Sequence, residues 1–316
     1  MADVLILGGT GWLGRHIAAQ SLADGDDVTC LARGTSGAVP HGARLVRADR
    51  RDPDAYDPVR RPWDRVVEVA SDPGLVAGAL DALADHAGHW TLVSTVSVSA
   101  DDDRPGADES APLVEPTDLS QYADAKVAAE RATAERLGDR LLIARPGLIV
   151  GPGDPSDRFG YWPARLSQPG PVLIPTPTDR FVQTVDVRDL AAWIARTDAT
   201  GPVNVVGDAV PMDAFFREAV AVAGFAGELL PLEDEALLEH DVRYWAGPRS
   251  LPLWLPRSAS GFARRSNSAF RQSGGTTRPL RTTLRDVLTD EQARGVTRPR
   301  RSGLTLAEEA AVLAAR

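Results

Sequence analysis

Tyr122 and Lys126 stand four residues apart in the stretch SQYADAKVAAE, whose Ala-rich composition predicts a helix. Residues at positions i and i+4 of a helix share one face. An ammonium beside a phenol favours the phenolate and lowers its pKa from about 10 towards neutrality. Lys126 is the only lysine among 35 lysines and arginines, and an arginine at this position would be bulkier and forked. The pair therefore predicts a tyrosine that acts as a general acid or base.

A hydroxyl at the end of the preceding predicted strand is expected to complete this set. The segment TLVSTVSVSA offers Ser94, Thr95, Ser97 and Ser99. Such a hydroxyl would hydrogen-bond a substrate carbonyl and hold it for the tyrosine. The alternative for Lys126 is an ordinary helix-surface residue. With four tyrosines in the chain, a single lysine falls four residues after one of them by chance about once in eighty.

A glycine-rich loop, GGTGWLG, follows the apolar run 3–7 and precedes a helical pattern at 12–23. Gly8 permits the tight turn, Gly11 lets the backbone approach a pyrophosphate, and Gly14 lets the helix pack closely on the strand. Phosphates bind at such a helix N-terminus because its N–H groups are free. A plain glycine-rich turn is the alternative, but the strand–loop–helix context indicates a dinucleotide site. The loop residues expected to bind the cofactor are Gly8, Thr10, Gly11, Trp12, Leu13 and Gly14.

The end of the second predicted strand, CLARG, indicates which dinucleotide binds. An acidic residue there usually binds the ribose 2′-hydroxyl of NAD, but this chain has Ala32 followed by Arg33. Arg33 would pair with a 2′-phosphate. We therefore expect NADPH (NADP) to be favoured over NADH; the alternative is that Arg33 stacks on adenine and accepts either cofactor. Asp49, at the end of RLVRAD, is expected to contact the adenine edge or to cap its loop.

Strand and helix patterns alternate along the first half of the chain. Strand patterns occur at 3–7, 27–33, 43–49, 64–70, 89–97 and 140–150, with helical patterns at 12–23, 74–87 and 121–137. This alternation predicts an α/β fold with a Rossmann-type doubly wound parallel sheet. A segment rich in Pro and Gly then leads to a strand–helix pattern at 181–198, followed by helical pieces at 211–223, 233–240, 279–294 and 305–315.

The change in character after residue 150 predicts a smaller, mixed C-terminal substrate lobe. We expect the dinucleotide-binding domain to comprise residues 1–150, with 181–200 returning to it, and the substrate lobe to comprise 151–180 and 201–316. Ligands of such sheets bind beyond the carboxyl ends of the strands, so the cleft is expected between the lobes.

These features together resemble a known family. The glycine loop, the strand ending VSTVSV, YADAK, ARPGLIVGPGD and QTVDVRDLA are similar to the extended or atypical branch of the short-chain dehydrogenase/reductase superfamily, the NAD-dependent epimerase/dehydratase family. The resemblance covers residues 3 to about 200. It implies Thr95, Tyr122 and Lys126 as catalytic residues, with Lys126 also at the cofactor. The other cofactor-binding residues that it implies are Ala70, Ser71, Pro146, Gly147 and Leu148.

Two departures from the family pattern bear on the reaction. Nucleotide-sugar enzymes of the family commonly continue the hydroxyl strand into Val-Tyr-Gly, whereas this chain has Val98, Ser99 and Ala100. The acid of their NAD sites is also missing. We therefore expect an NADPH-dependent, ketoreductase-like enzyme that reduces a carbonyl or imine of a small hydrophobic or aromatic metabolite, with Tyr122 as the general acid. The alternatives are an NAD-dependent nucleotide-sugar epimerase or dehydratase and, in another class, a non-catalytic dinucleotide-sensing or RNA-associated protein.

Two clusters that combine arginine with aromatic residues, SDRFGYW and VRYWAG, are candidates for the substrate side. Such clusters stack on a flat ring while holding an anion, or they pack in the core of the lobe. The polar loop 100–120 either borders the cleft or is an ordinary surface loop. The candidate substrate residues are Ser97, Arg158, Tyr161, Trp162, Gln183, Tyr244 and Trp245, and the alternative role for Gln183 and the nearby Asp186 is to cap a helix.

Charge and composition exclude several classes of function. The net charge of −9 argues against a nucleic-acid binder. Residues 257–301 nevertheless hold eleven arginines and three acids, which predicts either a solvated segment or a patch that attracts an anion. The single cysteine, Cys30, leaves no disulfide framework, and no apolar run is long enough for a signal peptide or a membrane span. We expect a cytoplasmic protein with a small-molecule substrate, without a metal, nucleic-acid or membrane partner, and either monomeric or homodimeric.

Overall fold

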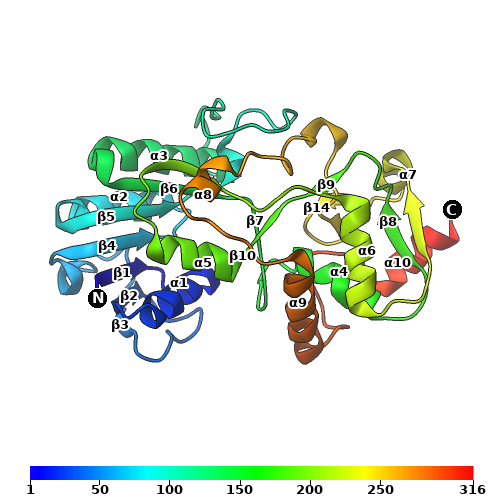
Figure 1. Ribbon diagram of the computed structural model, residues 1–316, viewed down its shortest axis with the longest axis horizontal. Helices are drawn as coiled ribbons and strands as arrows, with labels where there is room; N and C mark the ends of the chain where they lie inside the picture. The colour runs from blue at the N-terminus through cyan, green and yellow to red at the C-terminus, as the bar shows by residue number, and fades with distance from the viewer. Residues whose placement is uncertain (316) are drawn as a thin grey trace.

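The computed structural model describes residues 1–315, which form two lobes along the long axis of the molecule (Figure 1). The N-terminal lobe contains a seven-stranded sheet in the order β11-β6-β5-β4-β1-β2-β3. Each neighbouring pair of strands is parallel. The strands are β1 (Asp3–Leu7), β2 (Asp27–Ala32), β3 (Arg44–Arg47), β4 (Trp63–Glu68), β5 (Ala87–Val93), β6 (Leu141–Pro146) and β11 (Gly201–Val205).

Helices cover both faces of this sheet (Figure 1). α1 (Trp12–Ala23) packs with α5 (Val187–Arg196) on one face, and α2 (Pro73–Leu83) packs with α3 (Tyr122–Leu137) on the other. The central strands are mostly apolar because both of their faces are buried. The predicted doubly wound Rossmann-type sheet is confirmed.

The edge strand β11 corrects the predicted domain boundary. It pairs in parallel with β6, so residues 201–205 belong to the dinucleotide-binding sheet and not to the substrate lobe. Val203 and Val205 are buried in the core between this sheet and α5. The ring of Phe270, on α8 (Ser268–Gln272), lies in the same core, so this short helix also returns to the N-terminal lobe.

The C-terminal lobe has its own apolar core, built around buried aromatic rings that include Phe159, Trp162, Phe215 and Trp254. Two parallel strands, β7 (Leu148–Val150) and β10 (Thr184–Asp186), connect the lobes. The remaining helices are α4 (Arg158–Leu166), α6 (Met212–Ala223), α7 (Asp234–Glu239), α9 (Leu280–Arg294) and α10 (Leu306–Ala314). The remaining strands are β8 (Val172–Pro175), β9 (Phe181–Val182), β12 (Val210–Pro211), β13 (Leu229–Leu232), β14 (Arg243–Trp245) and β15 (Ser250–Pro252). Short 3₁₀ helices span Asp57–Val59, Ala84–His86, Val96–Val98, Gly138–Arg140 and Arg257–Ala259.

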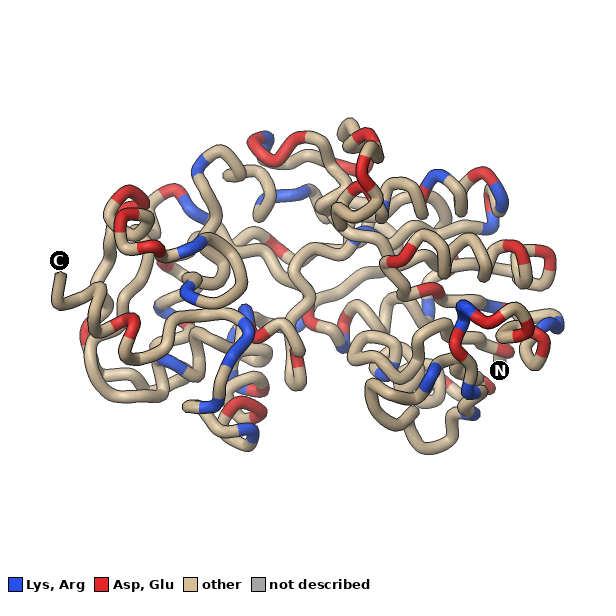
Figure 2. The backbone as a smooth tube through the Cα atoms, turned by 180° about the vertical axis from the view of Figure 1, so that it is seen from behind, with Lys and Arg blue, Asp and Glu red and all other residues tan. Residues whose placement is uncertain are grey.

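Figure 2 shows basic and acidic residues interspersed along the backbone of both lobes. The arginine-rich segment 257–301 pairs with carboxylates of its own and of other segments. Eight of its eleven arginines lie within 4 Å of a carboxylate. Three of them converge on the buried Glu291, and two of those also reach the buried Asp157. Most of its charge is therefore paired with carboxylates, and it does not form a continuous unpaired patch.

Within residues 1–315, no helix combines the length and the apolarity that crossing a membrane requires. The same residues contain no cluster of three or more His, Cys, Asp or Glu side chains arranged to hold a metal ion.

Candidate active site

The glycine loop forms a close turn between β1 and α1. Gly8 has φ of 102°, in the left-handed region that favours glycine. A Cβ at Gly14 would lie 2.5 Å from the carbonyl oxygen of Gly8 and 2.9 Å from Cα of Gly9, so glycine is required for this close packing. Within residues 1–315, no side chain caps α1 and its first turn carries no acid. Its N–H groups are therefore available to a phosphate, and the loop fits the pyrophosphate of a dinucleotide.

A cavity of about 190 Å³ extends from the glycine loop to the end of β2. The predicted residues that line it are Gly8, Thr10, Gly11, Arg33, Asp49 and Ala70. The Arg33 side chain is 59% exposed, and its Nη1 lies 3.8 Å from Oδ2 of Asp49. Asp49 also accepts a hydrogen bond from the Arg51 N–H at 3.1 Å, so it caps its loop. Thr35 and Ser36 line the same cavity. The sequence predicted Arg33 at this position, but not the hydroxyls of Thr35 and Ser36.

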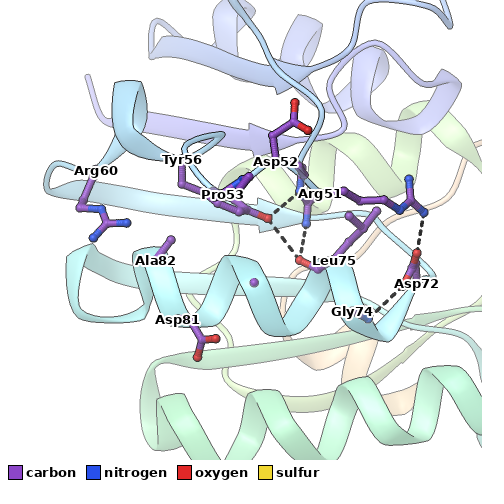
Figure 3. A pocket seen from close by; sticks show the side chains of 12 residues that line it. Arg51, Asp52, Pro53, Tyr56, Arg60, Asp72, Gly74, Leu75, Asp81 and Ala82 are labelled. Atoms are coloured by element: carbon purple, nitrogen blue, oxygen red, sulfur yellow. Dashed lines mark hydrogen bonds and ion pairs between the residues drawn. The ribbon is translucent and has the colours of Figure 1, made fainter.

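The loop after β3 is hydrogen-bonded to α2 along a groove (Figure 3). This groove lies beside the cavity at the glycine loop. Tyr56 Oη donates a hydrogen bond to Leu75 O at 3.3 Å, and Arg51 pairs with Asp72 at 2.8 Å. Arg50 donates to Tyr56 Oη at 3.0 Å and to Leu75 O at 2.8 Å. These internal bonds hold the loop beside the cavity at the glycine loop.

A second cavity, of about 400 Å³, lies between the lobes and contains most of the remaining predicted residues. Its lining includes the predicted cofactor residues Trp12, Leu13, Ser71, Lys126, Pro146, Gly147 and Leu148. The predicted catalytic and substrate residues that line it are Thr95, Tyr122, Ser97, Arg158 and Trp245. Val69 lines both this cavity and the one at the glycine loop, so the two are neighbours along the carboxyl edge of the sheet.

Lys126 is almost completely buried at the bottom of this cavity. Its Nζ donates hydrogen bonds to Ala70 O at 2.8 Å and Val93 O at 2.7 Å, so the ammonium joins the ends of β4 and β5. The Ala70 N–H in turn donates to the buried Glu68 carboxylate at 2.8 Å. Burial lowers the pKa of Lys126 to about 8, and the charges of Glu68 and Glu130 oppose this shift.

Tyr122 is the first residue of α3, and its phenol faces the cavity. Although 53% of its surface is exposed, burial around the phenol raises its pKa above the usual value of 10.0, and a hydrogen bond with Thr95 and the charge of Arg158 oppose this rise. The expectation that the Lys126 ammonium lowers this pKa towards neutrality is therefore wrong. The physical reason is that Lys126 is turned towards the strand ends, where it bonds to backbone carbonyls.

Three hydroxyls gather where β5 ends. Thr95 is 7% exposed, and its Oγ1 donates a hydrogen bond to Ser97 Oγ at 3.2 Å and accepts one from the Ser97 N–H at 3.2 Å. Ser94 Oγ is buried and has no hydrogen-bond partner among residues 1–315. All three residues line the cavity, so it presents several hydroxyls to a ligand beside Tyr122.

The wall contributed by the C-terminal half of the chain combines one cation with aromatic rings. The Arg158 guanidinium lies over the Trp245 ring, 5.0 Å from its centroid, and Trp245 meets Phe262 edge to face at 5.4 Å. Arg158 Nε donates to Ser156 Oγ at 3.2 Å. Asp154 is buried in the same wall, and burial raises the pKa of its carboxyl group. This arrangement can hold a ligand that has both a polar and an apolar part.

The chain matches proteins of one known family. The model of the NAD dependent epimerase/dehydratase family matches residues 4–85. A curated protein of Caulobacter vibrioides (strain NA1000 / CB15N), named ceramide reductase, is 30% identical over 265 residues, which cover 74% of this chain and 75% of that protein. The chain belongs to the NAD-dependent epimerase/dehydratase family. It is an NAD(P)-dependent enzyme.

Solved structures have the fold of this family member. The UDP-glucuronic acid 4-epimerase of Bacillus cereus in complex with NAD is 14% identical with a TM-score of 0.67, and the match covers 92% of this chain and 99% of that chain. RMD from Pseudomonas aeruginosa, complexed with NADPH, is 19% identical with a TM-score of 0.64, and the match covers 93% of this chain and 100% of that chain. At these identities the likeness concerns the fold alone.

Four predicted substrate residues of this epimerase/dehydratase-family enzyme do not line the cavity. Tyr161 and Trp162 are in the core of the C-terminal lobe, because α4 is buried from Phe159 to its end. Gln183 Nε2 is buried and donates to Gly207 O and Arg265 O, each at 2.9 Å. Tyr244 packs on Trp254 at 3.9 Å, and its hydroxyl donates to Asp234 at 3.2 Å. Asp186 caps α5 by accepting the Arg188 N–H at 3.0 Å.

The structure adds Asp154, Ser156 and Phe262 to the residues expected at the cavity. Asp154 belongs to the GPGD stretch, which contributed to the family resemblance but did not predict that Asp154 lines the cavity. Phe262 had no signal, because it lies in the arginine-rich segment. That segment is tied to the loop 100–120 by Gly261 N–Asp102 O and Gly106 N–Arg264 O hydrogen bonds, both 2.7 Å. The loop thus packs against the segment that carries Phe262, but none of its residues lines the cavity.

Proposed function

We propose that this enzyme is an NADPH-dependent reductase of a carbonyl or imine group in a small substrate with an apolar or aromatic part. The observation that carries this proposal is the position of Tyr122, which lines one cavity together with Thr95, Lys126 and the aromatic wall of Trp245 and Phe262.

The residues of the chain fit the expected cofactor. Gly8 and Gly11 would hold its pyrophosphate at the N-terminus of α1. Arg33, with Thr35 and Ser36 beside it, would hold a 2′-phosphate. Pro146, Gly147 and Leu148 would flank the nicotinamide. When bound, the reduced nicotinamide supplies hydride to the substrate carbon.

The polar groups of the cavity would handle the substrate oxygen. Thr95 orients it by a hydrogen bond, and Tyr122 donates the proton that converts it to a hydroxyl. The raised pKa of Tyr122 keeps the phenol protonated at neutral pH, which suits proton donation in the reductive direction. Lys126 holds the carbonyls of Ala70 and Val93, and so fixes the strand ends that border the cofactor.

Two observations support reduction over epimerisation. The Caulobacter vibrioides relative is named as a reductase. The end of β2 carries Ala32, followed by Arg33, where an acid usually binds the ribose 2′-hydroxyl of NAD. A reductase must exchange its dinucleotide after each turnover, whereas an epimerase oxidises and reduces its substrate with the same one.

The test is to denature the purified protein, identify any released nucleotide by mass spectrometry, and titrate fresh protein with NADPH and NADH. We expect substoichiometric nucleotide and tighter binding of NADPH. Stoichiometric NAD that does not exchange would overturn the reductase proposal and favour a nucleotide-sugar epimerase or dehydratase.

A further inference from the structure

Arg158 differs from the other arginines buried near the sheet. Arg50 and Arg145 each donate to a carboxylate at 3.0 Å, of Glu68 and Glu130 respectively. Arg158 is also partly buried, but no carboxylate of residues 1–315 lies within 4 Å of its guanidinium, and its side-chain partner is the neutral Ser156 hydroxyl. A buried cation without a close counter-ion is costly unless something else binds it.

Two residues that contact Arg158, one before it in the chain and one below its guanidinium, have an uncommon backbone conformation. Asp157, directly before it, has φ of 59°, and Trp245, under its guanidinium, has φ of 68°. For a bulky residue such as tryptophan this region is a marked outlier, and such outliers gather at ligand-binding positions. The Asp157 carboxylate is anchored by Arg298 and by the Arg301 N–H at 2.9 Å. The arginine-rich C-terminal segment thus fixes the turn that aims Arg158.

Helix stability does not explain an arginine at this position. Arg158 is the first residue of α4, where the helix dipole disfavours a positive charge. Its charge instead acts on the cavity, since it opposes the rise that burial causes in the pKa of the Tyr122 phenol. The Trp245 face below the guanidinium stabilises the cation, and leaves its other N–H groups to bind a ligand.

We propose that Arg158 binds a carboxylate of the substrate, so that the substrate class is the oxo acids whose apolar or aromatic part packs against Trp245 and Phe262. This inference rests on the proposed carbonyl reduction, because it identifies a carboxylate as the substrate group beside the carbonyl that is reduced. A guanidinium and a carboxylate match as a two-pronged pair. A phosphate or diphosphate, which carries more charge, fits less well, because Arg158 and Lys126 are the only cations in the cavity lining of residues 1–315 and Lys126 is occupied by backbone carbonyls.

Binding of phenylacetate and of its neutral analogue phenylacetamide, measured by calorimetry on the NADP-loaded protein, tests this inference without turnover. We expect phenylacetate to bind the wild type at least about tenfold more tightly than phenylacetamide. Arg158→Gln should remove this preference, and Arg158→Lys should restore part of it. The control is Arg257→Gln, which changes an exposed arginine outside the cavity and should keep the full preference. Unchanged thermal unfolding and NADPH affinity will establish that the variants fold.

Three results would overturn the inference: equal affinity of the two compounds for the wild type, no measurable phenylacetate binding, or a preference that survives Arg158→Gln. Failure of the proposed function is recognised separately. A protein that prefers phenylacetate through Arg158 but reduces neither phenylpyruvate nor neutral ketones would contradict carbonyl reduction. A protein that reduces neutral ketones at a rate indifferent to Arg158→Gln and shows no carboxylate preference would contradict the inference alone.

Discussion

Lys126 lies one turn of α3 beyond Tyr122, and the hydrogen bonds of its ammonium go to the carbonyl oxygens of Ala70 and Val93 rather than to the phenol. The spacing of the two residues is that of a catalytic pair, but the side chains act on different parts of the site. Lys126 organises the strand ends that border the cavity. Thr95 and Arg158 are the groups that favour ionisation of Tyr122.

Titration of Tyr122 tests whether Lys126 acts directly on the phenol or only on the strand ends. We expect the phenol of the cofactor-free protein to ionise above the usual value of about 10, because burial outweighs the effects of Thr95 and Arg158. The measurement is the phenolate absorbance of the wild type minus that of Tyr122→Phe as pH rises. Arg158→Gln should move the titration to still higher pH. Ionisation near neutrality would restore a direct action of Lys126 on the phenol.

The buried ammonium of Lys126 predicts a pH dependence of stability. Its pKa is about 8 in the folded protein and 10.5 as the model value, so between these values the unfolded chain binds more protons. The contribution of Lys126 to the free energy of unfolding should therefore rise with pH across this window and be level below about 7. Denaturant unfolding of wild type and Lys126→Met at a series of pH values isolates the effect. A difference between the two proteins that falls with pH would contradict this account.

Arg33 predicts the preference between the two dinucleotides. Arg33→Ala should weaken NADPH binding by about 10- to 100-fold, the effect of losing a charge-assisted bond to the 2′-phosphate. NADH binding should change little, because NADH lacks that phosphate. Arg60→Ala, in the neighbouring groove (Figure 3), is the control and should leave both affinities unchanged. Equal losses for NADPH and NADH would indicate that Arg33 stacks on adenine.

The glycine loop makes a prediction about stability. The added methyl of Gly14→Ala would meet the Gly8 carbonyl oxygen at 2.5 Å, and such overpacking costs about 1–3 kcal/mol. Gly78→Ala is the matched control on α2, where the nearest atom lies at an ordinary 3.7 Å, and it should stabilise the helix by about 0.5–1 kcal/mol. Chemical denaturation with and without NADPH measures both. If Gly14→Ala unfolds and binds NADPH like the wild type, α1 does not depend on this contact.

Local patterns in the sequence were sufficient for the nucleotide-binding half. The apolar runs, the glycine spacing and the Tyr122–Lys126 spacing depend on residues that are close in the chain, and the structure has the predicted parallel sheet with both residues at one cavity. The edge strand β11 was missed because its short run follows a helix and resembles the irregular segment after it. Its place in the sheet depends on pairing with β6, about 60 residues earlier.

The substrate side was less predictable because its contacts join distant segments. Arg158 and Trp245 meet across 87 positions of sequence, and Phe262 joins them from a segment that looked like a basic loop. Tyr161 stands beside these residues in the sequence pattern, yet helical packing carries it into the core. The charge of residues 257–301 left open a solvated segment or an anion site. Most of its arginines instead pair with carboxylates, some of the segment itself, such as Glu291, and some distant in the sequence, such as Asp157.

The most direct test of the central claim is NADPH oxidation by the wild type and by Tyr122→Phe with a panel of carbonyl compounds that includes phenylpyruvate. We predict that the wild type reduces at least one member of the panel. Tyr122→Phe should lower kcat by about 10²- to 10⁴-fold, the effect of losing a general acid, and should keep the NADPH affinity of the wild type. A Tyr122→Phe variant that reduces the same carbonyl at the wild-type rate would contradict the account.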